Sequence, residues 1–491
     1  MSPQRLYGNW LRPQQLSVRG VGWKGLLFAV AAYFTGLTIM QTHPLAGLGL
    51  LGGCLAITGL SAIRIGGASL RDAAGTTARW HWATTRHRTQ FHAITPDRWR
   101  LPGPLAGTRM IAVHSGGRVY GAIHHPHTRQ IAVTLDLAST AADLTDAIDH
   151  DVAVARWERW LESLGRRPEI TQVAVTVETS PSPGTRLREA VQRRVSTLAP
   201  LDCQTLMNDL VAVSPAVAAG TQTRITLVFD LRAWDAQITR RARRDGLDAY
   251  LPLMDRAVAS LQASLDGCGV TVIARATPAD LGAIVRVAFD PAASGQVELA
   301  LASMAPLPSW DLAGPAAAHE HRDRYVHDSG TSVSFVWAQA PRQLVTSTVL
   351  DPLTRPGQYR KRVTCTYLPT PAADTMDAAT AQVRWRWLTQ MVSRLPIIGR
   401  PSTAQDERDA QAAQQATYEV AAGAGWIAQT LTVTITVLDD VDLPAAIAEI
   451  EHAAGTSQLR LRRLYELQTA GFIAGLPVGL SLTDLARRWT R

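Results

Sequence analysis

The sequence predicts an α+β protein: an N-terminal two-helix transmembrane hairpin, followed by a cytoplasmic mixed α/β body with a projecting helical hairpin. Two uncharged apolar runs lie close together at residues 25–41 and 44–63. From about residue 93, segments that alternate like strands are interspersed with segments of helical periodicity. Of the 491 residues, 46% are hydrophobic and 18% are charged, a composition that excludes an intrinsically disordered chain.

The two apolar runs have the lengths expected of membrane-spanning helices. A bilayer core needs about 20 apolar residues, with roughly 17 as the lower limit, and neither run contains Asp, Glu, Lys or Arg. Within the second run Gly49 and Gly53 have the GxxxG spacing that lets two helices pack closely. Two alternatives are a cleaved signal peptide, which the second apolar run argues against, and a buried hairpin of a soluble domain.

Basic and aromatic residues flank both runs. By the positive-inside rule both termini are then cytoplasmic, and the protein is placed in the inner (plasma) membrane with the lipid bilayer as a partner. Trp23, Trp80 and Trp82 suit an interfacial aromatic belt. The basic residues that set this topology are Arg5, Arg12, Arg19 and Lys24 before the first run, and Arg64, Arg71 and Arg79 after the second.

The net charge of the chain is concentrated near its N-terminus. The formal net charge of the whole chain is +8. Residues 1–100 contain 11 Lys and Arg against 2 Asp and Glu, a net of +9, whereas the other 391 residues contain 38 against 39, a net of −1. The basic part suits topology and anionic headgroups. The balanced remainder favours protein partners, and no direct nucleic-acid site is predicted.

The sequence divides into a membrane hairpin and two α+β units. The hairpin with its basic flanks covers residues 1–92, the first unit residues 93–290 and the second residues 319–491. A Pro-, Ala- and Ser-rich linker at residues 291–318 separates the two units. In the first unit we expect strands at 110–114, 118–124, 130–137, 172–178, 223–230 and 270–274, and helices at 146–164, 248–265 and 278–289.

The second unit is expected to carry the projecting helical hairpin. Its strands are predicted at 332–339, 359–368 and 426–437, and Asp442 precedes a further helix. Residues 373–422 read as two helices joined by a loop that contains Pro396 and Pro401. Ile397 and Ile398 lie at the apolar tip of this hairpin and are a candidate partner contact.

Residue usage excludes several kinds of chemistry. The chain has 47 Arg and only two Lys, and neither Lys24 nor Lys361 stands in the Gly-Lys-Ser/Thr motif of a P-loop. The four cysteines are far apart, so no zinc knuckle or redox pair is encoded. His124-His125-Pro126-His127 is the densest histidine cluster, and a strand-end turn explains it better than a metal site. The sequence predicts no enzyme, no catalytic residue, no cofactor and no metal.

Short motifs occur in order along essentially the whole chain. They are Tyr7-Gly8-Asn9-Trp10 with Arg12-Pro13, Tyr120-Gly121 with His124-His125-Pro126, Val177-Glu178-Thr179, Pro183-Gly184-Thr185-Arg186-Leu187-Arg188, His327-Asp328-Ser329, Leu461-Arg462-Arg463-Leu464-Tyr465 and Leu476-Pro477-Val478-Gly479-Leu480. The ordered set resembles an actinobacterial membrane protein family of integrative conjugative elements. That family looks like a PrgI-like two-helix membrane hairpin fused to the N-terminal, non-ATPase domain of a type IV secretion assembly ATPase.

The resemblance implies a function without catalysis. It implies a structural subunit of a conjugative type IV secretion system for DNA transfer, with a separately encoded ATPase and other channel subunits as partners in a multi-subunit assembly. No catalytic residue is implied, because the motifs of the family offer none. The alternatives are an inner-membrane subunit of a type VII secretion complex, a membrane-tethered enzyme that uses His or Asp residues, and a DNA-binding module.

Overall fold

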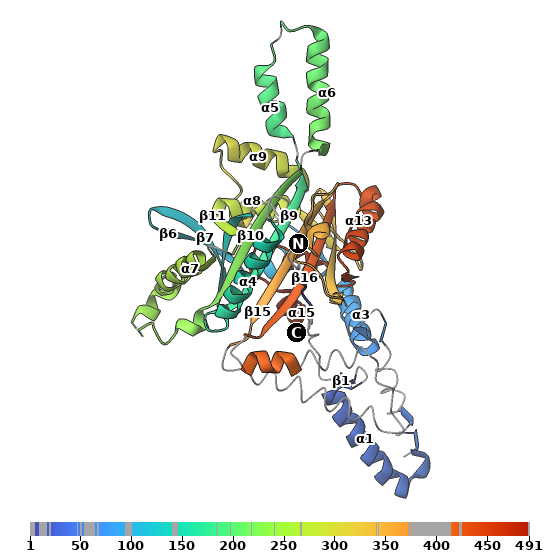
Figure 1. The fold of residues 1–491 in the computed structure, drawn as a ribbon. Coiled ribbons are helices and arrows are strands. Elements are labelled where there is room, and N and C mark those ends of the chain that lie inside the picture. Colours follow the sequence, from blue (N-terminus) through green and yellow to red (C-terminus); the bar gives the residue numbers. More distant parts are fainter. Residues whose placement is uncertain are drawn as a thin grey trace. The chain divides into compact units, whose positions relative to one another are not determined.

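The structure is a computed structural model of the chain. It describes residues 5–8, 17–18, 21–46, 48–49, 52–53, 64–65, 68–93, 101–139, 146–182, 184–196, 198–217, 219–239, 241–265, 268–339, 341, 343–371, 375, 414–421 and 425–489. The chain divides into two compact units (Figure 1). The larger unit comprises Met1–Gly8, Thr89–Ala372 and Gly425–Arg491, and the smaller unit comprises Asn9–Arg88 and Ala373–Ala424.

The smaller unit contains the region where the transmembrane hairpin was predicted. Its elements are β1 (Ser17–Val18), β2 (Val21–Gly22), α1 (Trp23–Thr42), β3 (Arg64–Ile65), β4 (Ala68–Ser69) and α3 (Leu70–Thr85). In the described part of the chain, no helix combines the length and the apolar character needed to cross a bilayer. The predicted transmembrane hairpin, and the localisation that rested on it, are therefore wrong. The prediction counted uncharged residues, but polar side chains such as Thr35, Thr38 and Gln41 interrupt α1.

The larger unit is built on one antiparallel sheet of 13 strands. Its strands are β5 (Gln90–His92), β6 (Arg109–Ser115), β7 (Arg118–His125), β8 (Gln130–Ser139), β9 (Ile170–Pro181), β10 (Ala219–Asp230), β11 (Val270–Arg275), β12 (Ala317–Glu320), β13 (Tyr325–His327), β14 (Gly330–Gln339), β15 (Arg360–Pro369), β16 (Ile427–Val437) and β17 (Arg460–Arg463). They follow the order β5-β12-β13-β14-β16-β15-β9-β10-β8-β7-β6, and β11 also pairs with β8 and β17 with β14.

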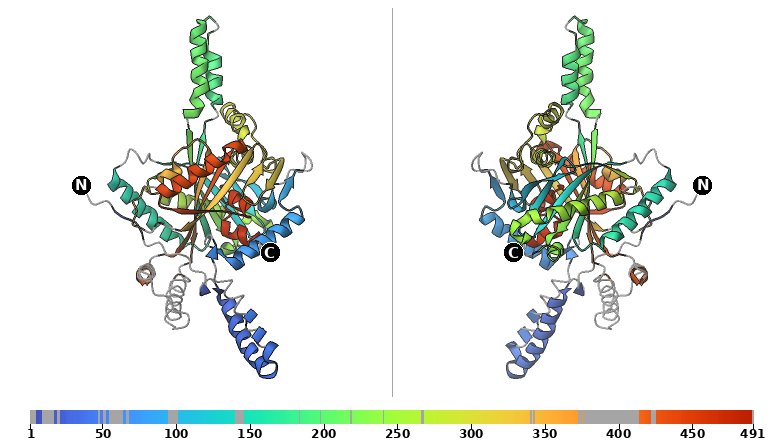
Figure 2. Two further views of the ribbon diagram at one scale, coloured as in Figure 1. Left: turned by 90° about the vertical axis from the view of Figure 1, so that its right-hand side faces the viewer. Right: turned by 90° about the vertical axis from the view of Figure 1, so that its left-hand side faces the viewer.

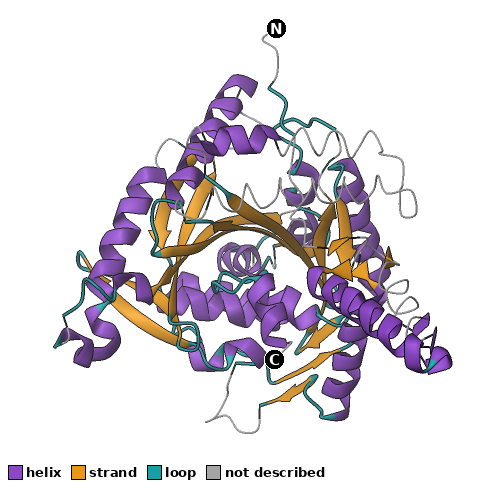
Figure 3. Ribbon diagram, turned by 90° about the horizontal axis from the view of Figure 1, so that it is seen from below, coloured by secondary structure: helices purple, strands orange, loops and turns teal. Residues whose placement is uncertain are grey.

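Helices cover the sheet on both faces (Figure 3). The helices of the larger unit are α4 (Ala147–Leu164), α5 (Thr185–Arg194), α6 (Leu201–Val217), α7 (Leu251–Leu265), α8 (Pro278–Phe289), α9 (Ser294–Ser303), α10 (Asp351–Thr354), α13 (Leu443–Thr456), α14 (Gln468–Ala474) and α15 (Leu482–Trp489). Short 3-10 helices are η2 (Gly103–Leu105), η4 (Leu231–Trp234), η5 (Ala242–Ala249), η6 (Pro291–Ala293), η7 (Trp310–Leu312) and η8 (Asp440–Asp442).

The strand order reveals two copies of one topology. The succession β8-α4-β9-β10-α7-β11 is a β-α-β-β-α-β unit whose strands lie in the order β11-β8-β10-β9, the ferredoxin-like arrangement. The succession β14-α10-β15-β16-α13-β17 repeats it, with the order β17-β14-β16-β15. The repeats join through β9 and β15, so the central part of the sheet is symmetrical about that pair.

Each repeat carries an insertion at the same place. The connection from β9 to β10 contains α5 and α6, which extend away from the sheet (Figures 1 and 2). The equivalent connection from β15 to β16 spans residues 370–426. It includes the segment 373–422 in which a helical hairpin was predicted, most of which, with Ile397 and Ile398, lies outside the described residues.

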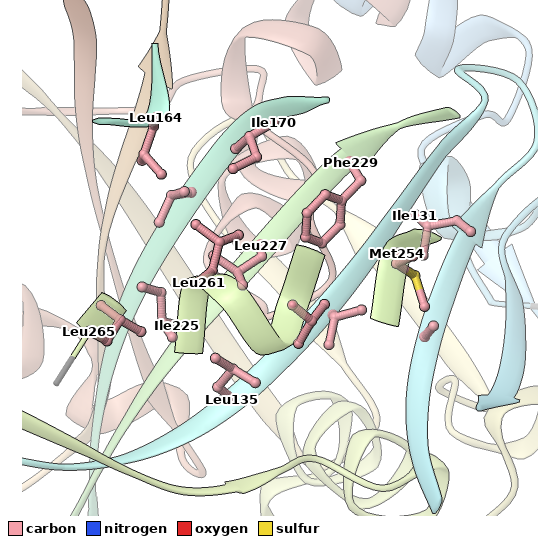
Figure 4. Packing of buried hydrophobic residues seen from close by; sticks show 14 of the residues in the cluster. Ile131, Leu135, Leu164, Ile170, Ile225, Leu227, Phe229, Met254, Leu261 and Leu265 are labelled. Atoms are coloured by element: carbon pink, nitrogen blue, oxygen red, sulfur yellow. The ribbon is translucent and has the colours of Figure 1, made fainter. Parts of the chain in front are cut away.

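Alternation along the strands gives the sheet two different faces. Successive side chains of a strand point to opposite sides, and β10 places Ile225, Leu227 and Phe229 on one side and Arg224 and Thr226 on the other. The first side, here called the apolar face, packs against α4 and α7 in the first repeat (Figure 4) and against α13 in the second. Burying one such Leu or Phe side chain contributes about 1.5–3 kcal/mol.

The second side of the sheet, here called the polar face, is rich in hydroxyl groups. Hydroxyls of neighbouring strands lie within hydrogen-bond distance in four pairs. Threonine is β-branched and favours strands, and paired hydroxyls let it be buried there without an unsatisfied group. The pairs are Thr134–Thr226 and Thr176–Thr364, both at 3.0 Å, Ser334–Thr434 at 3.0 Å and Ser332–Thr436 at 2.8 Å.

Local sequence explains where several elements begin. The predicted helix 278–289 is confirmed as α8, because Thr277 and Asp280 form a capping box and Pro278 occupies the first turn. Thr185 is the first residue of α5, but Gly184, with φ of 64°, is the residue at the N-cap. The Thr185 hydroxyl donates to Glu298 of α9 instead, at 2.9 Å. Local sequence patterns did not predict α6, α9, α10, α14, α15 or several short strands.

Candidate functional site

The polar face of the sheet is covered by residues 464–481, here called the C-terminal segment. The segment contains α14 and the Leu-Pro-Val-Gly-Leu motif, and it is buried almost throughout. His125 on β7 bonds through Nε2 to the Val478 carbonyl oxygen at 2.8 Å. The Thr134 hydroxyl on β8 donates to the Pro477 carbonyl oxygen at 3.0 Å. The polar face therefore holds the segment by hydrogen bonds to its backbone.

Glycines allow the backbone of the segment to lie directly on the sheet. A Cβ atom at Gly471 would lie 2.5 Å from the Ser334 Cβ, and one at Gly479 would lie 2.5 Å from the Ala132 Cβ. Gly479 also has φ of +75°, a region that side-chain-bearing residues rarely adopt. The glycines in this stretch are thus required by close approach and, at Gly479, by backbone conformation as well.

Replacing Gly479 by alanine is expected to lower the free energy of unfolding by about 2 kcal/mol or more. The positive φ alone costs about 1–2 kcal/mol for a residue with a Cβ, and the close contact with Ala132 adds overpacking. Urea unfolding followed by tryptophan fluorescence measures the change. Gly220→Ala is the control, because no atom lies within 4 Å of a Cβ built there. Equal effects of the two substitutions would contradict the packing argument.

Two side chains anchor the start of the segment. Gln468 accepts a hydrogen bond from the Ser334 backbone amide at 2.8 Å and donates to the Leu464 carbonyl at 2.7 Å. Glu320 at the end of β12 accepts from the Thr469 backbone amide at 2.9 Å. Burial raises the pKa of Glu320 to about 7, because desolvation outweighs these backbone hydrogen bonds. Glu320 is thus a buried carboxyl group that titrates near neutral pH.

A buried charge cluster lies on the polar face where the two repeats join. Glu178 on β9 bonds to Arg360 on β15 at 2.9 Å and to Arg224 on β10 at 3.3 Å. Arg362 is the residue of β15 that pairs with Glu178 in the sheet register. Arg224 also reaches Asp136 on β8 at 3.1 Å. The cluster therefore links four strands across the join.

The arginines keep Glu178 ionised although it is fully buried. Burial raises the pKa of Glu178, but attraction to Arg360, Arg362 and Arg224 outweighs burial and places the pKa below its ordinary value. Burial lowers the pKa of Arg362 to about 10, with repulsion from Arg360 and Arg224 opposing the attraction of Glu178. A carboxylate held in this way is an ion in a low-dielectric site, which is stable only while its partners remain.

Arg362 is satisfied less completely than its neighbours. Only 1% of its surface is exposed, and its two terminal nitrogens have no hydrogen-bond partner among the described residues. Its guanidinium lies over the ring of Phe472 in the C-terminal segment, 4.7 Å from the ring centroid. A cation–π contact of this kind compensates part of the desolvation cost. Arg362 thus connects the charge cluster to the segment.

His327 and Ser332 have the geometry of a hydrogen-bonded dyad. His327 Nε2 lies 2.8 Å from the Ser332 Oγ, and Nδ1 lies 2.7 Å from the Phe289 carbonyl oxygen. Burial lowers the pKa of His327 to about 4. Both residues have 0% exposed surface, and Ser332 also bonds to Thr436. A substrate has no access to this serine, so the pair acts as an anchor between β13, β14 and β16.

Most of the residues predicted for membrane contact belong to the smaller unit. Gly49 and Gly53 are exposed, and nothing lies within 4 Å of a Cβ built on either, so the described part of the structure packs no helix against this GxxxG pair. The guanidinium of Arg79 donates to the Gly75 carbonyl within α3. Trp80 is half-buried, and the guanidinium carbons of Arg86 and Arg88 lie 4.4 Å and 4.6 Å from the centroid of the Trp82 ring.

The remaining predicted residues fall into three groups. Trp23 and Lys24 lie in α1, Arg64 in β3 and Arg71 in α3, whereas Arg12 and Arg19 lie outside the described residues. Arg5 belongs to the larger unit and donates its backbone amide to Asp151 at 3.1 Å. Beside it, Tyr7 pairs with Val345 and donates its hydroxyl to Asp151 at 2.9 Å. Arg5 therefore contributes to attachment of the N-terminal residues to the sheet domain.

The polar face forms hydrogen bonds with the C-terminal segment and carries the buried charge cluster. No group of three or more His, Cys, Asp or Glu side chains in the described part of the chain is arranged to hold a metal ion. His125, from the histidine cluster, binds the C-terminal segment. No protein-family model and no curated protein matches this chain.

Glu178, His125 and Val478 belong to separate sequence motifs, and the sequence does not indicate that they meet. Their partners Arg224, Arg360 and Arg362 are ordinary strand residues in the sequence. Nothing in local periodicity signals that they share one face of a sheet across the join of two repeats. A comparison of residues 130–275 with 330–463 at the level of element order would have revealed the duplicated topology.

Proposed function

We propose that this chain is a non-enzymatic structural subunit of a conjugative type IV secretion assembly and that it acts by binding a separately encoded ATPase. The single observation that carries the proposal is that residues of four of the seven motifs meet in one place. His125, Glu178, His327 and the Leu476–Leu480 motif, far apart in sequence, lie in one buried region around the C-terminal segment. Unrelated short matches would be expected to scatter over the surface.

The architecture supports the same role. A broad sheet stabilised by a buried charge cluster is a rigid platform, and such a platform suits a part that positions other proteins. The α5–α6 insertion leaves large apolar side chains exposed, which is typical of interaction surfaces. In the type IV secretion ATPases whose N-terminal domain the family resembles, the Leu-Pro element precedes the nucleotide-binding domain, so a Leu-Pro element held against the sheet is consistent with a role beside a separate ATPase.

Co-purification tests the proposal. The full chain carries an affinity tag and is co-expressed with the ATPase encoded by the same conjugative element, and the ATPase is expected to elute with it in a constant ratio. A P-loop ATPase from an unrelated system, at equal expression, is the control and is expected in the flow-through. Loss of DNA transfer on deletion of the gene, with recovery on complementation, is the expected cellular result. Absence of the ATPase from the eluate would overturn the proposal.

A further inference from the structure

The insertion in the first repeat, here called the α5–α6 hairpin (residues 184–217), is formed by α5 and α6. The two helices lie side by side, with Val191 and Val211 among the residues that line the groove between them. At its base the hairpin is fixed by Thr185, whose hydroxyl donates to Glu298 of α9. Beyond this base the hairpin extends away from the sheet (Figures 1 and 2).

The side of α6 away from the groove carries an unpartnered apolar stripe. Cys203, Leu206, Met207 and Leu210 recur at positions i, i+3, i+4 and i+7, which places them on one side of a helix. All four are exposed: 61% of Leu206, 57% of Leu210 and 41% of Met207 are accessible. This spacing is the one by which helices pack against other helices. The stripe is therefore a helix-packing surface.

The two arms of the hairpin have opposite charge. On α5, Arg188 and Arg194 are exposed, and on α6, Asp202 and Asp209 are exposed. These four residues form no ion pair with one another in the described structure. The hairpin therefore has a basic arm and an acidic arm.

We propose that the α5–α6 hairpin is a self-association surface that binds the same hairpin of a second copy of this chain. The two hairpins lie side by side with their tips at the same end. In this two-fold arrangement the apolar stripes of both α6 helices face the centre of a four-helix bundle. Asp202 of each copy lies beside Arg194 of the other. The opposite charges of the two arms of a single chain select a second copy as the occupant. The inference goes beyond the proposed function and does not depend on it.

Light scattering of the full chain over a concentration series tests the stripe. The wild-type chain is expected to form a dimer with a concentration-dependent mass. The double substitution Leu206→Glu with Leu210→Glu places four carboxylates in the bundle centre and is expected to raise the dimer dissociation constant by at least ~100-fold. Val441→Glu, at an exposed valine outside the hairpin, is the control and is expected to dimerise like the wild type. A monomeric wild type, or a stripe variant that still dimerises, would overturn the proposal.

A charge exchange tests the identity of the partner. Asp202→Arg alone and Arg194→Asp alone each bring like charges together in a homodimer, and each is expected to weaken it by about tenfold. Mixing the two variants creates a heterodimer in which both contacts again join opposite charges, so the mixture is expected to recover wild-type affinity. Circular dichroism checks that each variant is folded. Two weakened variants that stay weakened after mixing would overturn the arrangement.

Discussion

Glu178→Gln is expected to lower the free energy of unfolding by about 3–5 kcal/mol, the usual cost of removing one partner of a buried ionic group. The carboxylate is the counter-ion for Arg224, Arg360 and Arg362, of which Arg224 and Arg362 are themselves buried. Without it, these guanidinium groups remain in a low-dielectric site without Glu178 to neutralise them. Urea unfolding at pH 7, followed by tryptophan fluorescence, measures the loss.

Two controls separate the charge cluster from ordinary surface pairs. Glu189→Gln removes the partner of Arg193 in an exposed i,i+4 pair, and the expected change is about 0.5 kcal/mol or less. Arg362→Met is expected to cost far less than Glu178→Gln, because Arg224 and Arg360 still neutralise Glu178 and an incompletely bonded guanidinium is removed. If Arg362→Met and Glu178→Gln destabilise equally, the cluster is not held together by Glu178.

Glu320→Gln is expected to change the dependence of stability on pH. Because the pKa of Glu320 is raised from 4.5 to about 7 in the folded protein, folding favours the protonated carboxyl. Below pH 4.5 the carboxyl is protonated in both the folded and the unfolded protein, so it does not lower the free energy of unfolding. This free energy falls as the pH rises from 4.5 to about 7, because only the unfolded protein then loses the proton, and it stays lower above pH 7. The full fall is roughly 3 kcal/mol from the size of the shift. At pH 8 the glutamine variant, which cannot ionise, is expected to be the more stable protein.

The difference in the free energy of unfolding between Glu320→Gln and the wild type separates the effect of Glu320 from that of the other titrating groups. Unfolding free energies are measured from pH 5 to pH 8 for the wild type, Glu320→Gln and the control Glu451→Gln, an exposed residue of α13. The advantage of Glu320→Gln over the wild type is expected to grow with pH, whereas that of the control is flat. An advantage that is constant with pH would show that Glu320 does not titrate near 7. Glu178 acts in the opposite sense, since its lowered pKa makes its stabilising contribution disappear in acid.

Regular elements of the sheet domain could be predicted from the sequence because their signals are local. Helix 278–289 matches α8 residue for residue, since Thr277, Pro278 and Asp280 define its start within four positions. The strand predicted at 130–137 lies within β8, where alternating residues reveal a half-apolar strand. The prediction of a transmembrane hairpin also rested on a local signal and is wrong. A count of uncharged residues does not test whether a helix is both long enough and apolar enough to cross a membrane.

The candidate site could not be read from the sequence, because its members are neighbours only through sheet register. Glu178 and Arg362 meet because β9 pairs with β15, a contact between residues 184 positions apart. The C-terminal segment meets His125 across more than 350 positions. The α6 stripe is different, since Cys203, Leu206, Met207 and Leu210 have a helical spacing that local reading could have detected.

The sequence by itself determined the local choices: which residues alternate, where proline and capping side chains begin a helix, and that the chain contains no P-loop lysine. Tertiary structure decided how those elements combine. Two β-α-β-β-α-β repeats pair edge to edge in one sheet. Threonines and arginines of their strands lie on the face that the C-terminal segment covers, and the α5–α6 hairpin extends away from the sheet. The physical reason is that strand register and burial of charge depend on pairings between distant segments, which no local pattern encodes.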